Sequence, residues 1–210
     1  MVLERSAVVL SEARIRLPTM RIAEHAVGEV RLRPAHRPSM RQLKIAIAGA
    51  GIAGLTAARA LQTFGFRPIV YEQAASLGEV GAGLTVSPNA THVLNALGME
   101  DVLERLGMRP NRGGVKHWQT GELMVEISRG NEMLEKYGAA YYQIHRADLH
   151  RELADLVVTT DPDAIRPGHA FRSVEEHNGA LTIHFENGTM ASADVLIGAD
   201  GVRSRVRAAL

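Results

Sequence analysis

The stretch IAIAGAGIAGLTAARALQTFGFRPIVYEQ, residues 45–73, constrains the fold more than any other part of the chain. The short apolar run 43–48 predicts a buried parallel strand, and the glycines that follow predict a tight turn into a helix. Of these, Gly49 permits the turn, Gly51 lets the backbone approach a pyrophosphate, and Gly54 lets the helix pack close to the strand.

The same stretch continues with features that suit a nucleotide. The start of the helix presents free N–H groups and a partial positive charge to a diphosphate. A second apolar run, 69–71, ends at Glu72. An acid about 20 residues beyond such glycines is expected to accept hydrogen bonds from the adenosine ribose, and its charge disfavours the 2′-phosphate of NADP. The stretch predicts an adenine dinucleotide site without distinguishing NAD from FAD.

Composition limits the class of protein. The chain has 210 residues, of which 46% are hydrophobic and 22% charged, as is typical of soluble globular proteins. A net charge of +1 gives no reason to expect a nucleic-acid or membrane partner, and no apolar stretch approaches the length of a membrane span. The absence of cysteine excludes disulfides and thiolate sites. It suits a reducing compartment, so we expect a cytoplasmic protein.

Residues 1–39 differ from the rest of the chain because they are rich in arginine and contain no aromatic residue. They have no continuous apolar segment of the kind a secretory signal needs, and their four glutamates argue against a mitochondrial transit peptide. Met40 directly precedes the first predicted strand. We therefore expect a disordered extension or a mis-assigned start over 1–39, and the folded domain over 40–210.

The chain after residue 73 alternates between helical and strand patterns. A glycine-rich loop at 77–83 leads to a helix that begins at Ser87 and Pro88, a favourable pair for a helix start. Turn signals such as Asn178-Gly179 separate short alternating runs, which predicts a β-meander over 171–193. Further predicted elements are helices over 89–97 and 100–106, a hairpin of 115–118 with 123–127, and strands over 141–144 and 195–199.

Arginine and histidine are the two residue types whose positions bear on ligand binding from the pattern alone. Arg146 opens a predicted helix, where the helix dipole does not favour a cation, so it is a candidate ligand contact as well as a possible surface arginine. The nine histidines are scattered, and His145 and His150 are badly spaced for one helix face. We therefore expect no metal site.

The joint pattern resembles a known family. The glycine motif with Glu72, followed by GEVGAGLTVSPNA, HRADLH and DVLIGADGVRSRVR, is similar to the single-component FAD-dependent aromatic hydroxylases, in particular salicylate hydroxylase and its relatives. The resemblance covers 44–207 in the expected order. Its most specific part is the ADG stretch, which ordinary Rossmann dehydrogenases lack.

The resemblance implies roles for individual residues. Gly49, Gly51 and Gly54 would hold the FAD pyrophosphate and Glu72 the adenosine ribose, while Phe171 would pack near the adenine.

Five further positions follow from the same resemblance. Gly83 and Thr85 lie on the loop that approaches the flavin, and Arg146 contacts FAD. Asp200, followed by Gly201, supports the pyrophosphate region and helps with NAD(P)H. No catalytic residue is assigned.

The implied chemistry belongs to the flavin. NAD(P)H reduces FAD, O₂ adds to give a C4a-hydroperoxide, and its terminal oxygen attacks a small phenolic substrate. Thr85 stands where the 6-hydroxynicotinate branch carries histidine, which favours a salicylate-like or other hydroxybenzoate substrate. The alternatives are a 6-hydroxynicotinate-type monooxygenase and a non-catalytic FAD- or nucleotide-binding module. An NAD-dependent dehydrogenase is a further alternative, against which the ADG stretch argues.

The expected fold is α/β, a Rossmann-like FAD/NAD(P)-binding domain of the glutathione-reductase type with a β-meander. The family continues well past the position of Leu210, which implies a truncated chain holding a partial FAD-binding domain. A hairpin at about 112–145 would be inserted from the sheet of the substrate domain. We expect the isolated chain to have little or no turnover.

Overall fold

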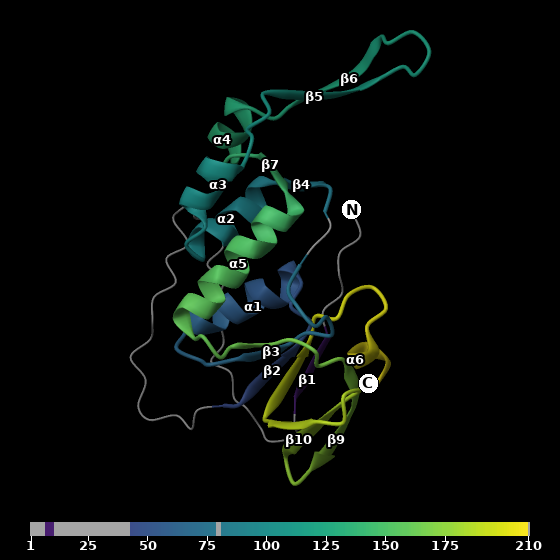
Figure 1. Ribbon diagram of the computed structural model, residues 1–210. Helices are drawn as coiled ribbons and strands as arrows, with labels where there is room; N and C mark the ends of the chain where they lie inside the picture. Colours follow the sequence, from purple (N-terminus) through teal and green to yellow (C-terminus); the bar gives the residue numbers. More distant parts are fainter. Residues whose placement is uncertain (1–6, 11–42, 79–80, 210) are drawn as a thin grey trace. The chain divides into compact units, whose positions relative to one another are not determined.

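A computed structural model describes residues 7–10, 43–78 and 81–209 (Figure 1). These residues form two compact units, which are described separately. Among the described residues, the first unit holds 7–10, 43–78 and 150–209, and the second holds 81–149. Most of the expected N-terminal extension, and Glu79 and Val80 of the second glycine loop, lie outside the described residues.

A five-stranded sheet forms the centre of the first unit, in the order β1-β12-β2-β3-β8. Strands β12, β2, β3 and β8 run parallel, and β1 pairs antiparallel with β12 at the edge. Every residue of β2 is buried, as its apolar run predicts. The strands are β1 (Ala7–Leu10), β2 (Ile45–Ala48), β3 (Ile69–Tyr71), β8 (Ile165–Arg166) and β12 (Val195–Gly198).

One face of this sheet is covered by helices. Helix α1 (Ile52–Thr63) follows the glycine turn and buries Leu55 and Ala58. It ends at Thr63 with Phe64 as the C-cap residue, and Gly65 then adopts φ +83°, the left-handed conformation that glycine supplies at helix ends. The later part of α5 (Arg146–Thr160) lies beside α1 (Figure 1).

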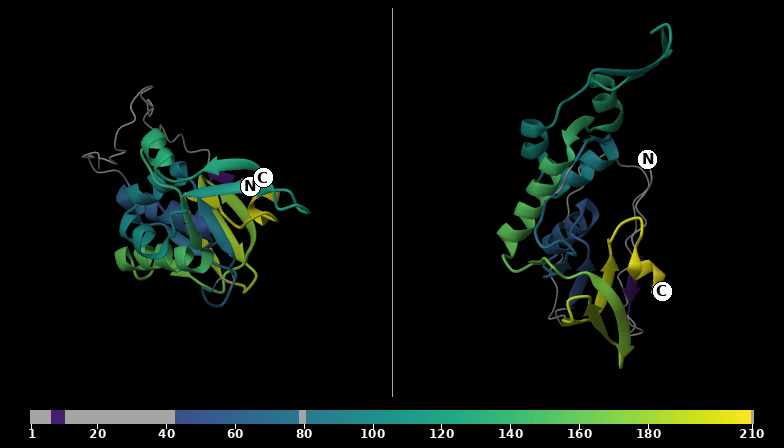
Figure 2. Two further views of the ribbon diagram at one scale, coloured as in Figure 1. Left: turned by 90° about the horizontal axis from the view of Figure 1, so that it is seen from above. Right: turned by 45° about the vertical axis from the view of Figure 1, so that its right-hand side comes forward.

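The opposite face of the sheet is covered by the predicted meander, which Figure 2 shows from two further directions. Strands β9 (Phe171–His177), β10 (Ala180–Phe185) and β11 (Met190–Ala193) are antiparallel neighbours. Asn178 and Gly179 both have positive φ, the hairpin turn that their sequence favours. A buried core joins the meander to the sheet through Leu181, Ile183, Phe185, Ala46, Ala48 and Leu196.

The second unit is built on an antiparallel ribbon of β4 (Gly83–Val86) and β7 (Tyr142–His145). Helices α2 (Pro88–Ala96), α3 (Glu100–Leu106) and α4 (Asn131–Tyr137) belong to the same unit. Ser87 stands at the predicted start of α2, although its hydroxyl donates to the Asn89 side chain at 2.6 Å instead of capping the helix backbone.

A long hairpin extends away from α3 and α4 within this unit (Figure 1). Its strands are β5 (Arg112–Lys116) and β6 (Leu123–Ser128), and Gly121 turns the chain with φ +72°. Its apolar side chains are exposed, and Trp118 is 85% accessible. Among the helices of the described ranges, none has both the length and the apolar character that crossing a bilayer requires.

Candidate functional site

The turn after β2 requires glycine at its first position. Gly49 has φ +102°, and a Cβ built there would lie 2.8 Å from the carbonyl carbon of Ala199 and 3.1 Å from the Cα of Asp200. Its N–H donates to the carbonyl of Tyr71 at 2.7 Å. Gly49 therefore lets the end of β2 lie directly against the backbone that follows β12.

The other two glycines serve different purposes. A Cβ on Gly54 would overlap the carbonyl of Gly49 and lie 3.4 Å from the Ala199 side chain, so this glycine is needed for close packing of α1. Gly51 has φ −70°, which any residue adopts, and apart from its neighbours in the chain no described residue comes within 4 Å of its Cβ position. Nothing in the described protein requires a glycine there, whereas a closely approaching ligand would.

The start of α1 is suited to an anion. The first N–H groups of a helix have no acceptor within the helix, and they carry a partial positive charge. Gly51 is the N-cap residue, and no side chain of the described chain caps this end or places an acid in its first turn. Backbone N–H groups beside open space fit the diphosphate of a dinucleotide.

Glu72 holds the turn from the neighbouring strand. It follows β3 directly, as predicted, and its Oε2 accepts the Ala50 N–H at 2.7 Å. Its Oε1 accepts the Ala74 N–H at 2.9 Å. A carboxylate offers about four lone-pair sites, so these bonds leave capacity for the hydroxyls of a ribose.

Asp200 shapes the chain after β12. Its Oδ1 accepts the Ser204 hydroxyl at 2.5 Å, and its Oδ2 accepts the N–H groups of Arg205 at 2.7 Å and Val206 at 3.1 Å. Asp200 thereby satisfies the first two N–H groups of α6 (Arg205–Ala208), whose N-cap residue is Ser204. Gly201 makes the turn with φ +83°. Since Gly49 packs against residues 199–200, Asp200 supports the glycine turn through the main chain.

Phe171 lies in the buried core between the meander and the sheet, and is 6% exposed. Its carbonyl accepts a hydrogen bond from Arg205 Nη1 at 3.3 Å, and the same nitrogen pairs with Glu186 at 2.5 Å. Phe171 therefore links the meander to α6, and its proximity to an adenine stays a prediction.

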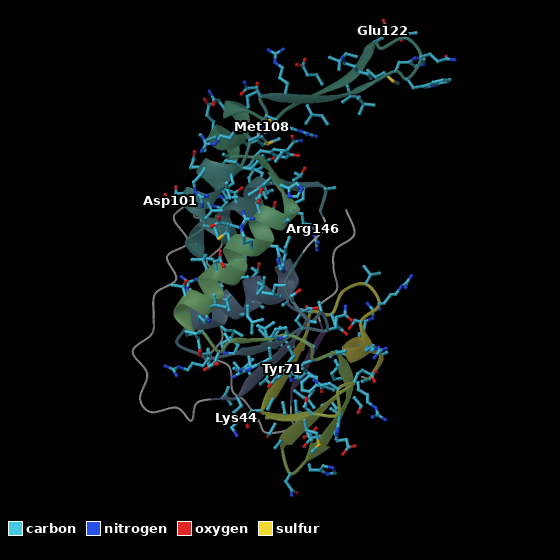
Figure 3. The ribbon with its side chains drawn as sticks, in the orientation of Figure 1. Lys44, Tyr71, Asp101, Met108, Glu122 and Arg146 are labelled. Carbon is cyan, nitrogen blue, oxygen red and sulfur yellow. The ribbon has the colours of Figure 1, made fainter. Side chains whose placement is uncertain are left out.

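Tyr71 lies at the end of β3 (Figure 3). It packs against Phe185 and His169, with ring centroids 4.6 and 5.6 Å away. Burial, partly offset by the charge of Arg166, raises the pKa of the Tyr71 hydroxyl above its ordinary value. The hydroxyl is therefore neutral at physiological pH, and the ring packs against the core between the sheet and the meander.

A side chain from α5 contacts the same turn, and the sequence pattern does not identify it as a site residue. His150 is buried on α5, and its Nε2 lies 2.6 Å from the carbonyl oxygen of Ala50. Its spacing from the apolar Leu153, Ala154 and Val157 would have indicated burial on one helix face. Its hydrogen bond to Ala50, 100 residues earlier in the chain, could not be predicted from the sequence pattern.

The remaining predicted residues gather in the second unit. Gly83 opens β4 opposite His145 in β7. Arg146 begins α5 (Figure 3), and its N–H donates to the Ala82 carbonyl at 3.2 Å. The exposed Thr85 hydroxyl accepts from Tyr141 at 3.3 Å.

The second glycine-rich loop packs closely at one position. A Cβ on Gly81 would lie 2.9 Å from the Cβ of Arg146, so this glycine is needed where the loop passes the start of α5. The predicted site residues thus fall into two groups, one in each unit. Across the part of the chain that the structure describes, no three His, Asp or Glu side chains gather as a metal site would require.

The parallel sheet, the glycine turn and the acid after the second strand define a dinucleotide-binding domain of the Rossmann type. The chain belongs to the FAD binding domain family, whose model matches residues 42–210. This confirms the expected fold class and cofactor, and it decides between NAD and FAD.

Named relatives are ring-hydroxylating enzymes, as the resemblance implied. The chain is 45% identical over 167 residues to 3-amino-4-hydroxybenzoate 2-monooxygenase of Streptomyces cremeus, covering 80% of this chain and 42% of that protein. It is 40% identical over 165 residues to 6-hydroxynicotinate 3-monooxygenase of Pseudomonas fluorescens, covering 78% and 42%.

A solved structure of an FAD-bound protein has the same fold over most of this chain. Klebsiella pneumoniae HpxO, complexed with FAD and uric acid, superimposes with a TM-score of 0.69 at 34% identity, over 78% of this chain and 41% of that one. The chain spans about two fifths of the length of the proteins it matches.

Proposed function

We propose that the protein to which these residues belong is an NAD(P)H-dependent flavin monooxygenase that hydroxylates a small phenolic or hydroxybenzoate-type ring, of which salicylate is the model. The observation that carries the proposal is the turn at Gly49 and Gly51, held by Glu72, in a chain 45% identical to an aminohydroxybenzoate monooxygenase. The lack of cysteine supports a cytoplasmic location.

We expect different groups of the described residues to bind different parts of FAD. The N–H groups at the start of α1 would hold the FAD diphosphate, and Glu72 would accept hydrogen bonds from the adenosine ribose. Gly83, Thr85 and Arg146 would lie towards the flavin. When bound, FAD supplies the redox chemistry that transfers one oxygen atom of O₂ to the ring.

The substrate class follows from the relatives. Their names specify rings that carry a hydroxyl group, an electron-donating substituent that favours attack by an electrophilic oxygen. The 40% identity to the Pseudomonas enzyme supports 6-hydroxynicotinate as a second candidate substrate, while Thr85 supports the hydroxybenzoates. A non-catalytic FAD-binding role is the remaining alternative.

The experiment begins with FAD binding by the purified chain, measured by calorimetry and by quenching of flavin fluorescence. NADH or NADPH oxidation is then followed with salicylate, 3-amino-4-hydroxybenzoate and 6-hydroxynicotinate, in the longest form of the protein that its gene encodes. Hydroxylated product matching the cofactor oxidised supports the proposal. FAD binding without product from any of these rings would leave only the non-catalytic role.

A further inference from the structure

His150 is a polar residue in an apolar position. It shares one face of α5 with Leu153, Ala154 and Val157, at the spacing of a buried helical stripe, and all four side chains are buried. A histidine with 5% of its surface exposed has lost its contacts with water, so it requires a specific hydrogen-bond partner.

That partner is the main chain of the glycine turn. The Nε2 atom of His150 lies 2.6 Å from the carbonyl oxygen of Ala50, a residue that is itself 1% exposed. A carbonyl oxygen can only accept, so Nε2 carries the proton and donates. The bond fixes the direction of the Ala50 carbonyl.

The neighbouring N–H groups of the turn are fixed from the end of β3. The Ala50 N–H is occupied by Glu72, and the Gly49 N–H by the Tyr71 carbonyl. The peptide bond from Ala50 to Gly51 is trans and planar, so the Gly51 N–H points opposite to the carbonyl that His150 holds. Holding the carbonyl therefore aims the Gly51 N–H, beside which the Cβ position is open.

The position of α5 relative to α1 is fixed at its other end as well. Gln62 Nε2 donates to the Val157 carbonyl at 3.1 Å, and Arg59 Nη1 donates to the Thr160 hydroxyl at 3.0 Å. His150 thus projects from a helix that is already attached to α1, which gives its hydrogen bond a defined geometry.

We propose that His150 is a positioning residue for the diphosphate of the dinucleotide: by holding the Ala50 carbonyl, it orients the Gly51 N–H towards the phosphate oxygens. It touches neither the ligand nor the reacting atoms. This inference rests on the proposed FAD site and adds a residue to it from a different helix.

The test asks whether His150 affects binding of the diphosphate specifically or binding of the whole nucleotide. ADP and adenosine share base and ribose and differ in the diphosphate, so their affinities are compared by calorimetry for the unmodified chain, His150→Leu and His150→Gln. Leu removes the donor at similar volume, whereas the Gln amide nitrogen can take the place of Nε2. We expect His150→Leu to weaken ADP and FAD binding ~10-fold, the size of one misplaced hydrogen bond, with adenosine affinity unchanged. His150→Gln should stay within about twofold of the unmodified chain.

The outcomes are distinct. If His150→Leu weakens ADP and adenosine equally, or neither, the residue is only structural and the inference is overturned. If the longest form of the protein that its gene encodes binds neither FAD nor ADP, the proposed function fails as well. If His150→Leu does not fold, the ¹⁵N NMR spectrum of the unmodified chain replaces it. An unprotonated Nε2 on His150 would overturn the inference. A protonated Nε2, together with a change in the Gly51 amide chemical shift when ADP binds, would support it.

Discussion

Replacing Gly51 with alanine should separate ligand binding from folding. The residue has φ −70° and ψ 178°, and within the described chain its Cβ position is open to 4 Å. Alanine at an N-cap costs at most about 1 kcal/mol relative to glycine, and the lower entropy of the unfolded chain offsets about 0.4–1 kcal/mol of that. The apo protein should therefore change its Tm by less than about 4 °C.

FAD affinity should respond much more strongly to the same methyl group. It occupies the space through which a phosphate oxygen reaches the Gly51 N–H, and a hydrogen bond to a charged group contributes about 1.5–3 kcal/mol. We expect Gly51→Ala to raise the Kd for FAD about 10- to 150-fold.

Calorimetric titration with FAD and thermal unfolding by circular dichroism measure the two effects. Gly78→Ala is the matched control, since its Cβ position is also open among the described atoms and should leave both values unchanged. Gly54→Ala is the contrast, because its methyl overlaps the Gly49 carbonyl and should cost about 1–3 kcal/mol of stability. Unchanged FAD affinity in Gly51→Ala would refute the claim that the diphosphate approaches this turn.

Three further predictions concern the rest of the chain. Asp200→Ala removes the acceptor for Ser204, Arg205 and Val206 and should lower stability by about 1–3 kcal/mol in denaturant titration, while Asp200→Asn, which keeps one acceptor, should lose less. Burial raises the pKa of the Tyr71 hydroxyl above 10.0, so its contribution to stability is complete below that pH and is lost as pH rises through the folded-state pKa. Tyr71→Phe should therefore flatten the dependence of stability on pH above about 10. An unchanged dependence would contradict the raised pKa of Tyr71. Trp118, the single tryptophan, is 85% exposed, so its fluorescence should be quenched by iodide as readily as that of free indole, and protection from iodide would show that the hairpin is covered in solution.

Local structure could be predicted wherever neighbouring residues in the sequence are enough to determine the backbone conformation or the buried face. Gly49 needs a positive φ, Asn178-Gly179 forms the hairpin turn that both residues favour, and the alternation of Leu181, Ile183 and Phe185 gives the buried face of β10. Each of these features depends on residues within a few positions of one another, so the pattern suffices.

Other features could not be predicted because their causes are distant in sequence or too weak. Strand β8 has two residues, Ile165–Arg166, which is too short for an alternating pattern, and it is ordered by pairing with β3. Helix α4, Asn131–Tyr137, buries no residue, so it has no apolar stripe to reveal it. The bond between His150 and Ala50 requires the packing of α5, which no local pattern specifies.

The pairing of β2 with β12 has a consequence for biosynthesis. The N–H of Lys44, next to β2, donates to the carboxylate of Asp194, 150 residues later, and Gly49 packs against Ala199. At synthesis rates of about 5–20 residues per second, that separation keeps one edge of β2 unpaired for roughly 8–30 s. The glycine turn is among the first described segments to leave the ribosome and among the last to complete its packing. Cofactor loading is therefore a late event, and the preceding interval, with an apolar strand edge exposed, is when a chaperone would protect this chain.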